Sequence, residues 1–388
     1  MATNESQQMT TADRVGIVAM FLGTFTVGID SFVLSPLLTT MAASFHAGTD
    51  QIALGVTAYA LACAIGAPLL APLGDRFRPQ VVAAIGILVF AVATVALTIQ
   101  TTLPGLYLFR VLAGLGGAMW MPNVQAYVTR RWPRPLSTKL IGIVVAGLSA
   151  AIALGVPVGA LLAGALSWQQ TFLGIAALAV LSAIVLFAGL GGERSVGAVA
   201  TRHLGDYAHT LSEPAVRWAL SATLVWMTGF YGLYTFLQNR LGIGVAASGG
   251  FLIAYGVGNF VASTTSGWVN TRLGAPHRPI VLFGVSSSLF VLGLTGVPLV
   301  PWLAVLLLLG WAVSQGFAAT GLITLAAAHG GGHVATVLAL NSSFIYVGAA
   351  LGSALFGLFH GPASVALGLP SIALTLAAGA FAVRASRS

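Results

Sequence analysis

Two charged residues of this sequence lie deep inside long apolar runs, where charged side chains are rare. Asp30 stands in the run from about residue 15 to 41, and Arg110 stands in the run from about residue 103 to 129. A charge at bilayer depth costs about 3 kcal/mol or more, so an ionisable residue there indicates a functional site and needs a partner. In antiparallel helices that rise about 1.5 Å per residue, Asp30 and Arg110 lie roughly 16 Å and roughly 10 Å from the same end. We therefore expect the two side chains at similar depth.

An aspartate beside an arginine can carry a proton. Burial favours the neutral form of a carboxylic acid, whereas a neighbouring cation favours the ionised form. We interpret Asp30 as the proton carrier and Arg110 as the group that tunes it, directly or through water. The alternative is a static ion pair that joins two helices, because structural pairs also perturb proton affinity. No Asp or Glu follows Glu213, so proton coupling through a carboxylate must use the first half of the chain.

The composition is that of a membrane protein. Of the 388 residues, 57% are hydrophobic and 6% are charged, and the mean hydropathy is +0.96. Soluble domains carry about 25% charged residues, and a membrane-spanning helix needs about 20 apolar residues. The sequence therefore predicts an all-α membrane protein with twelve transmembrane helices. Their approximate bounds are 15–41, 51–73, 81–100, 103–129, 137–166, 168–190, 215–238, 246–269, 278–298, 300–325, 334–359 and 364–383.

The basic residues lie almost entirely on one side of these spans. Of the sixteen Lys and Arg residues, fourteen are on that side: Arg14, Arg76, Arg78, Arg130, Arg131, Arg134, Lys139, Arg194, Arg202, Arg217, Arg272, Arg278, Arg384 and Arg387. The opposite side has only Arg240. Cytoplasmic loops carry an excess of Lys and Arg, so both termini are predicted to be cytoplasmic, in a multi-pass protein of the plasma (bacterial inner) membrane. The net charge of +8 reflects this orientation and gives no indication of nucleic-acid binding.

The chain divides into two similar halves. We predict a cytoplasmic tail over 1–14, a six-helix bundle over 15–190, a cytoplasmic linker over 191–214 and a second six-helix bundle with a short tail over 215–388. Two landmarks repeat at nearly the same offset. Arg76 follows the second span as Arg272 follows the eighth, 196 residues later (272 − 76). The glycines of the eleventh span stand 193 residues after those of the fifth (348 − 155), which indicates a duplicated six-helix unit.

Four segments carry specific motifs. They are Gly28–Leu37 around Asp30, Leu73–Phe77 after the second span, Leu108–Gly117 around Arg110, and Gly155–Gly164 in the fifth span. Together they resemble the major facilitator superfamily, in its drug:proton antiporter branch of bacterial multidrug and sugar-efflux-type exporters. The resemblance covers the whole chain and implies two pseudo-symmetric bundles with substrate between them near the bilayer midplane. The chain departs from the family pattern at Ala71 and Arg78, where Gly is usual, and at Thr271, where the acid is missing.

The resemblance also implies a cytoplasmic gate, for which the candidate residues are Asp75, Arg76, Arg131 and Arg272. Asp75 would face a helix N-terminus or an arginine such as Arg131 when the gate is closed, since acids are favourable at helix N-termini. The alternative is a basic turn with one counter-ion.

The glycine-rich fifth span corresponds to the antiporter motif of the family, with Gly155, Pro157, Gly159 and Gly164 as its packing residues. Small residues let helices approach closely, and a proline can bend a helix. We expect a tight, kinked contact between the two halves.

In this superfamily the first, fourth, seventh and tenth spans line the central cavity. The candidate substrate-contacting residues, with the eleventh span added, are Met121, Asn123, Trp226, Tyr231, Tyr234, Trp311, Gln315, Phe317, Asn341 and Tyr346. Aromatic side chains with a few polar groups suit amphiphilic, aromatic or weakly cationic molecules. The alternative for each residue is ordinary packing or an interfacial aromatic belt.

These features predict a proton-coupled secondary transporter that exports small amphiphilic, drug-like molecules by alternating access. The expected partners are the substrate, protons and the lipid bilayer, and the protein is expected to be a monomer without cofactor or metal. The sequence has no metal-ligand cluster, activated nucleophile or phosphate-binding loop, so we do not expect an enzyme. One alternative is a sugar or metabolite transporter of the same fold, by efflux or proton symport. A second alternative is a non-transporting sensor or a lipid flippase.

Overall fold

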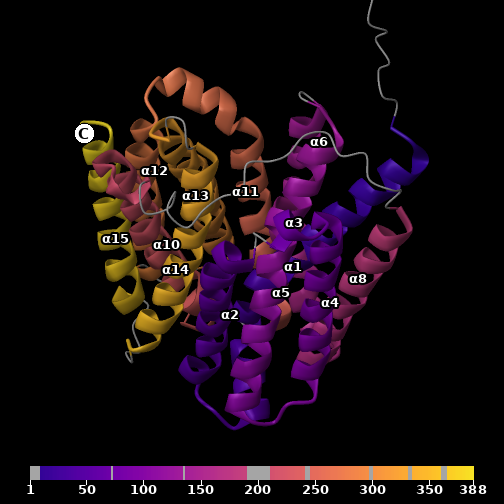
Figure 1. Ribbon diagram of the computed structural model, residues 1–388. Coiled ribbons are helices and arrows are strands. Elements are labelled where there is room, and N and C mark those ends of the chain that lie inside the picture. The colour runs from indigo at the N-terminus through magenta and orange to yellow at the C-terminus, as the bar shows by residue number, and fades with distance from the viewer. Residues whose placement is uncertain are drawn as a thin grey trace, which may run out of the picture.

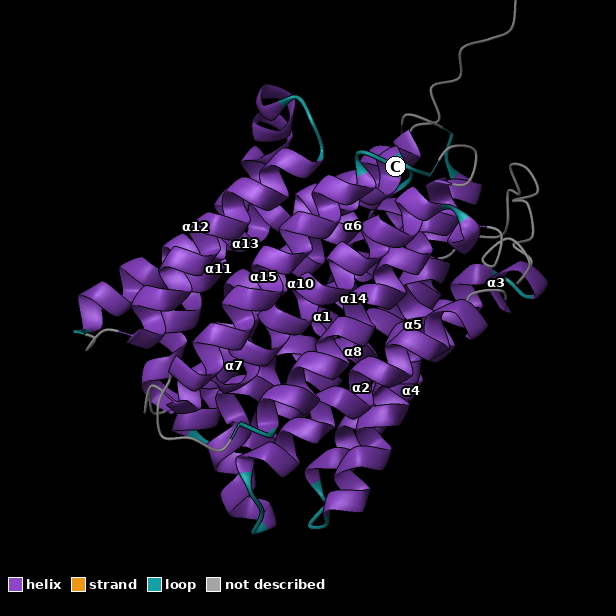
Figure 2. Cartoon of the chain, turned by 90° about the vertical axis from the view of Figure 1, so that its left-hand side faces the viewer, coloured by secondary structure: helices purple, strands orange, loops and turns teal. Residues whose placement is uncertain are grey.

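The computed structural model describes residues 9–70, 73–133, 136–189, 210–240, 245–296, 300–330, 334–359 and 365–388. Every regular element in these ranges is a helix (Figure 2). Helices satisfy their backbone hydrogen bonds within one segment, as a chain in hydrocarbon requires. Most of the linker predicted over 191–214 lies outside the described residues.

The helices follow the predicted spans closely. In the first half they are α1 (Thr11–Phe45), α2 (Thr49–Leu70), the short α3 (Leu73–Arg76), α4 (Pro79–Thr98), α5 (Leu103–Arg131), α6 (Leu136–Ala150), the π-helix η1 (Ala151–Gly155), α7 (Val156–Ala165) and α8 (Trp168–Gly189). In the second half they are α10 (Pro214–Arg240), α11 (Val245–Leu273), α12 (His277–Gly296), α13 (Pro301–Ala328), α14 (Val334–Gly357) and α15 (Val365–Ala385). The predicted fifth span is the continuous run α6–η1–α7.

Ten helices among the described residues are long and apolar enough to cross a membrane. The two predicted spans that fall short are α10 and α11. In α11 the segment Phe251–Ala262 is found as a shorter apolar helix. Twelve membrane crossings therefore remain a prediction, although a helix lies at each predicted position.

Helix α1 begins before the first predicted span. The sequence analysis began that span at about residue 15, whereas α1 begins at Thr11. The Thr10 side chain accepts a hydrogen bond from the Asp13 backbone N–H (3.1 Å), and the Asp13 carboxylate accepts one from the Thr10 N–H (3.0 Å). This reciprocal capping box starts the helix before the apolar run begins.

The two halves lie side by side, with the start of α1 and the end of α15 at the same end of the molecule (Figure 1). Their internal packing repeats. In the first half, a Cβ added to Gly155 would meet Ile29 of α1. In the second half, a Cβ added to Gly352 would meet the backbone of α10 at Thr228. Each half thus packs its glycine-bearing helix on its own first helix, in agreement with a duplicated unit.

The halves contact each other toward the end opposite to the termini. The Thr57 hydroxyl of α2 lies 2.8 Å from the Ser353 hydroxyl of α14. A Cβ on Gly256 of α11 would meet the backbone of Ala153 in η1. The second helix of each half therefore packs on the fifth helix of the other half.

A π-helical segment interrupts the predicted fifth span. Pro157 has no N–H to donate, so the carbonyl four residues earlier loses its usual partner. At the preceding residue, the Val156 N–H donates to the carbonyl of Ala151, five residues back, where the π-helix η1 lies. Single π-helical turns inside α-helices are frequent at functional sites.

Candidate functional site

Asp30 and Arg110 form a direct ion pair in the interior of the first half. The Arg110 Nη1 group lies 2.9 Å from Asp30 Oδ1 and 2.8 Å from Asp30 Oδ2. The residues are 0% and 1% exposed. Sequence reasoning expected the two at similar depth and left direct contact open; the geometry provides the contact.

Helix α2 holds the arginine side of this pair. The Arg110 Nε–H donates to the Gly55 carbonyl (3.2 Å). The guanidinium carbon lies 4.4 Å from the centroid of the Tyr59 ring. A cation over an aromatic face is worth about 2 kcal/mol when both are desolvated. The guanidinium is therefore fixed from two sides, and protonation of a carboxylate would weaken its contact to Asp30 and leave these two contacts in place.

Small residues allow α2 and α5 to approach closely enough for this contact. A Cβ on Gly114 would lie 2.5 Å from the Tyr59 carbonyl oxygen, and a Cβ on Gly55 would lie 2.8 Å from Leu106. Cys63 of α2 donates a weak hydrogen bond to the Gly114 carbonyl (3.3 Å). The glycines around Arg110 in the sequence thus have a packing reason.

Aromatic side chains fill the contact between α1 and α10. Phe32 stacks on Tyr231 with ring centroids 5.5 Å apart, and it meets Tyr234 edge-on at 5.5 Å. Three further rings continue this packing into α11 and α13. We define the aromatic cluster as Phe32, Phe230, Tyr231, Tyr234, Tyr255 and Trp311, all of them buried.

Two polar features accompany the aromatic cluster. The Ser35 hydroxyl donates toward the backbone carbonyls of Tyr234 (2.7 Å) and Thr235 (3.0 Å), which ties α1 to α10. The Tyr234 hydroxyl is buried and has no hydrogen-bond partner among the described residues. An unpaired buried hydroxyl costs about 1–3 kcal/mol, which a water or ligand group could recover.

Several predicted cavity residues are instead used inside the second half. The Trp226 indole N–H donates to Gln315 Oε1 (2.7 Å), between α10 and α13. Asn341 Oδ1 accepts a hydrogen bond from Thr223 (2.7 Å). Phe317 stacks on Phe283 of α12, with centroids 4.5 Å apart. The structure does not bring Trp226, Gln315, Phe317 and Asn341 to the aromatic cluster, because their partners lie on neighbouring helices of their own half.

Asn123 also differs from the expectation. Its Oδ1 faces Gly74, at the position that a Cβ there would occupy, and is buried without a hydrogen-bond partner among the described residues. Asn123 lies thirteen residues after Arg110, or roughly 20 Å along α5, and therefore packs against the turn after α2. Met121 and Tyr346 are half-buried.

The predicted gate region contains an ion pair that sequence reasoning missed. Arg131, at the end of α5, donates to Asp13 Oδ1 from Nε (3.0 Å) and Nη2 (2.7 Å). Burial raises the pKa of Asp13, but hydrogen bonds from Arg131 and Thr10 outweigh this effect and hold the pKa below its usual value. Asp13 stands before the apolar run 15–41, at the end of the molecule that carries the termini. The capping-box spacing from Thr10 was the available sequence signal.

The other gate candidates lie nearby or at the equivalent place in the second half. Arg130, the neighbour of Arg131 at the end of α5, donates to the Gly74 carbonyl (3.0 Å) in the turn after α2. Arg76 is exposed and lies 6.0 Å from the Phe77 ring centroid. Arg272 lies 4.1 Å from the Trp268 ring centroid. The side chain of Asp75 is outside the described part of the structure, so its expected contact with Arg131 stays a prediction.

The glycine motif packs within the first half more than between the halves. A Cβ on Gly159 would meet Val33 of α1 at 2.9 Å, as one on Gly155 would meet Ile29. Gly164 is exposed. Contact with the second half comes from Ile152 and Ala153, whose backbone adjoins Gly256. The π-helix η1 lies directly before Val156 and Pro157, and Gly155 and Gly159 face α1.

Comparison with known proteins identifies the fold and the family. The family model of the Major Facilitator Superfamily matches residues 20–353. The chain belongs to the major facilitator superfamily. A bacterial homologue of the human lysosomal transporter Spinster, solved in an inward-facing and occupied conformation, superposes with a TM-score of 0.74 at 18% identity over 96% of each chain.

Relatives of this major facilitator transporter have varied names. An uncharacterised transporter of Bacillus subtilis, YwfA, is 29% identical over 97% of this chain and 93% of its own. The tetracenomycin C resistance and export protein of Streptomyces glaucescens is 26% identical over 69% of this chain and 60% of its own. The 4-hydroxybenzoate transporter PcaK of Acinetobacter baylyi is 27% identical over 44% of this chain and 38% of its own.

The residues that sequence reasoning missed lie mostly on α2 of this transporter. Gly55, Thr57 and Tyr59 connect the buried pair to α14, yet α2 contains no charge beyond Asp50 near its start. Residues 55, 57 and 59 are spaced two apart, whereas residues on one face of a helix are spaced three or four apart. Sequence periodicity therefore did not indicate that these three residues act together. Among the described residues no group of three or more His, Cys, Asp and Glu could hold a metal ion.

Proposed function

We propose that this transporter exports small amphiphilic molecules in exchange for protons, with Asp30 as the proton carrier. The observation that carries the proposal is the buried Asp30–Arg110 pair, whose arginine keeps other contacts if the carboxylate is protonated. Protonation of Asp30 removes the charge attraction but leaves Arg110 on Gly55 and Tyr59. The pair can then open without stranding the guanidinium.

The proposed cycle uses two arrangements of the halves across twelve spans, with both termini in the cytoplasm. In this orientation the contacts between the halves lie at the outer end, as in a cytoplasm-facing state. Substrate enters from the cytoplasm and proton binding at Asp30 favours the opposite arrangement. A ligand can shift such an equilibrium only by its differential affinity for the two states. Exchange follows when substrate and proton favour different states, and one chain suffices for this cycle.

The proposed substrates are planar or aromatic molecules with few polar groups. The aromatic cluster supplies ring faces between the halves, and the Tyr234 hydroxyl can pair with one polar group of a ligand. Binding sites lined by aromatic and apolar side chains hold ligands by apolar contact and use a few polar groups for orientation. A relative named for tetracenomycin C resistance and export agrees with this class.

A second candidate function is transport of an aromatic metabolite, in either direction. The relative named as a 4-hydroxybenzoate transporter supports it. Uptake coupled to protons predicts that substrate and proton bind together, whereas export by exchange predicts that they compete. A sensor or lipid flippase predicts no movement of a soluble compound.

The test measures proton release and transport with the same purified protein. Tetracenomycin C, chloramphenicol and 4-hydroxybenzoate are added to detergent-solubilised protein with a pH-indicating dye, and to proteoliposomes with an imposed proton gradient. The exchanger should release protons on binding at least one compound. It should move that compound across the membrane in the direction opposite to the flow of protons down the imposed gradient. Asp30→Asn should lose both, while the exposed-surface control Glu213→Gln keeps both. Transport by Asp30→Asn at the parent rate would refute the mechanism, and proton uptake on binding would favour symport.

A further inference from the structure

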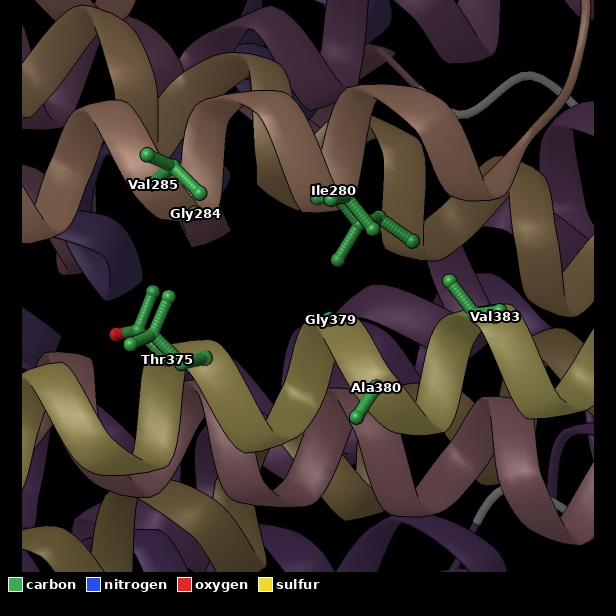
Figure 3. Close-up of a pocket in the computed structure, with 9 residues that line it drawn as sticks. Ile280, Gly284, Val285, Thr375, Gly379, Ala380 and Val383 are labelled. Atoms are coloured by element: carbon green, nitrogen blue, oxygen red, sulfur yellow. The ribbon is translucent and has the colours of Figure 1, made fainter.

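A narrow groove runs along the surface of the second half between α12 and α15 (Figure 3). It has a volume of about 180 Å³. The lining residues are Ile280, Val281, Gly284, Val285, Thr375, Leu376, Gly379, Ala380 and Val383. All but Thr375 have side chains without polar atoms. Val281, Val285 and Leu376 are each more than a third exposed, so the groove opens outward from the helix bundle.

The groove is separate from the proposed transport site. None of its lining residues belongs to the aromatic cluster or contacts the Asp30–Arg110 pair. Gly379 forms part of the α15 wall, and a Cβ there would lie 3.7 Å from Val281 on the facing helix. Figure 3 shows Gly379 opposite α12, with Ile280 and Val383 toward one end of the groove. A larger side chain on the α15 wall would therefore occupy the groove.

Two arginines stand where the groove reaches the end of the molecule that carries the termini. Arg278 precedes Ile280 by two residues, and Arg387 follows Val383 by four, about one helical turn. Arg278 lies in the first turn of α12 and Arg387 lies just beyond the end of α15, so both border the same end of the groove. Arg278 donates to the Leu273 carbonyl (2.8 Å) through Nη1, and a guanidinium has further N–H donors.

The second half offers these arginines no carboxylate side chain. No Asp or Glu occurs after Glu213 in the sequence. Arginine pairs strongly with phosphate, often through two parallel hydrogen bonds. Basic positions between membrane helices on the cytoplasmic side bind anionic lipid head groups. Charge complementarity therefore favours an anionic group from the membrane at this place.

We propose that the α12–α15 groove binds an anionic phospholipid, with one acyl chain between the helices and its phosphate beside Arg278 and Arg387. A phospholipid matches the two features that meet here, because its acyl chain fits an apolar groove and its phosphate pairs with arginines. The site is independent of transport chemistry and would keep α12 and α15 together while the halves move. It predicts selection of lipids by charge at the arginines and by shape at the groove.

The test uses full-length protein in detergent and native mass spectrometry, with phosphatidylglycerol and phosphatidylcholine as probes. The parent should retain phosphatidylglycerol at least tenfold more than phosphatidylcholine. R278Q/R387Q should lose this preference, whereas the matched control R76Q, an exposed arginine of the first half, should keep it. Ala380→Leu, an exposed lining position, should lower retention of both lipids at least threefold. The control Gly267→Leu places leucine where a Cβ meets nothing within 4 Å.

Three outcomes overturn the proposal. They are equal retention of both lipids by the parent, an unchanged preference in R278Q/R387Q, and a dimer mass that disappears in Ala380→Leu, which would make the groove a contact between copies. Each variant is first checked for a single symmetric gel-filtration peak. If R278Q/R387Q fails that check, R387Q alone, at an exposed position beyond α15, gives the same comparison.

Discussion

The Thr57 hydroxyl of α2 lies 2.8 Å from the Ser353 hydroxyl of α14. Thr57 stands two residues after Gly55, whose carbonyl accepts a hydrogen bond from Arg110. Thr57 thus connects the buried ion pair to the contact between the halves. The same short segment carries Tyr59, whose ring lies against the Arg110 guanidinium. Any shift of Arg110 that moves this segment must also act on the Thr57–Ser353 contact.

Replacement of Thr57 by valine should weaken the contact between the halves without changing side-chain volume. A hydrogen bond contributes about 0.5–1.5 kcal/mol net, so the equilibrium between the two arrangements should shift about two- to tenfold away from this one. Spin-label or fluorophore distances across the outer ends of α2 and α14 measure that shift. Thr264→Val is the control, because Thr264 is exposed and bonds only to its own helix. An unchanged distance distribution in Thr57→Val would show that Thr57 does not hold the halves.

Tyr59 should position Arg110 through its ring and not through its hydroxyl. Tyr59→Phe keeps the ring face and should retain transport, while Tyr59→Leu removes it. A less well held guanidinium stabilises ionised Asp30 less, so the pH at half-maximal transport should rise by about 0.5 to 1 unit in Tyr59→Leu. Transport measured between pH 5 and pH 9 separates this shift from a simple loss of folded protein. Equal midpoints in both variants would exclude the positioning role.

The glycines of the two motifs should differ in how strongly their replacement by alanine destabilises the protein. A Cβ at Gly352 would meet backbone atoms of Thr228 and Gly232, which cannot rotate away. Overpacking costs about 1–3 kcal/mol, so Gly352→Ala should lower the melting temperature by several degrees. Gly164→Ala, at an exposed position of the motif, should leave it unchanged. Equal melting temperatures for the two variants would contradict the packing of α14 on α10.

The sequence predicted the fold well because its apolar runs are long and its basic residues lie on one side. Asp30 and Arg110 were identifiable because each is the one residue of its sign within an apolar run. The positions of polar and aromatic residues on their helices were not predictable in the same way. Trp226 and Gln315 suited a cavity by type, yet they pair with each other inside the second half. Which face a residue presents depends on helix rotation, and apolar runs without a polar face leave that rotation undetermined.

Residue 74 should need to be glycine because the Asn123 side chain packs against it. A Cβ at residue 74 would overlap with Asn123 Oδ1, so Gly74→Ala should destabilise the turn after α2. Because Asn123 Oδ1 has no hydrogen-bond partner among the described residues, Asn123→Ala should be tolerated and should make room. The double variant G74A/N123A should therefore recover at least half of the melting temperature lost in Gly74→Ala. Additive losses would mean that the glycine is needed for another reason.

The Asp13–Arg131 pair should stabilise the protein equally across the pH range in which transport varies. Because the pKa of Asp13 lies below its usual value, near 3.9 in unfolded chains, its contribution is present above that value and is lost as pH falls through the lower, folded pKa. Asp13→Asn should therefore reduce the free energy of unfolding by about 1 kcal/mol, to the same extent at pH 5.5, 6.5 and 7.5. Its transport–pH profile should keep the parent midpoint, whereas Asp30→Asn should have no pH-dependent transport. A shifted midpoint in Asp13→Asn would assign part of the proton coupling to the end of α1.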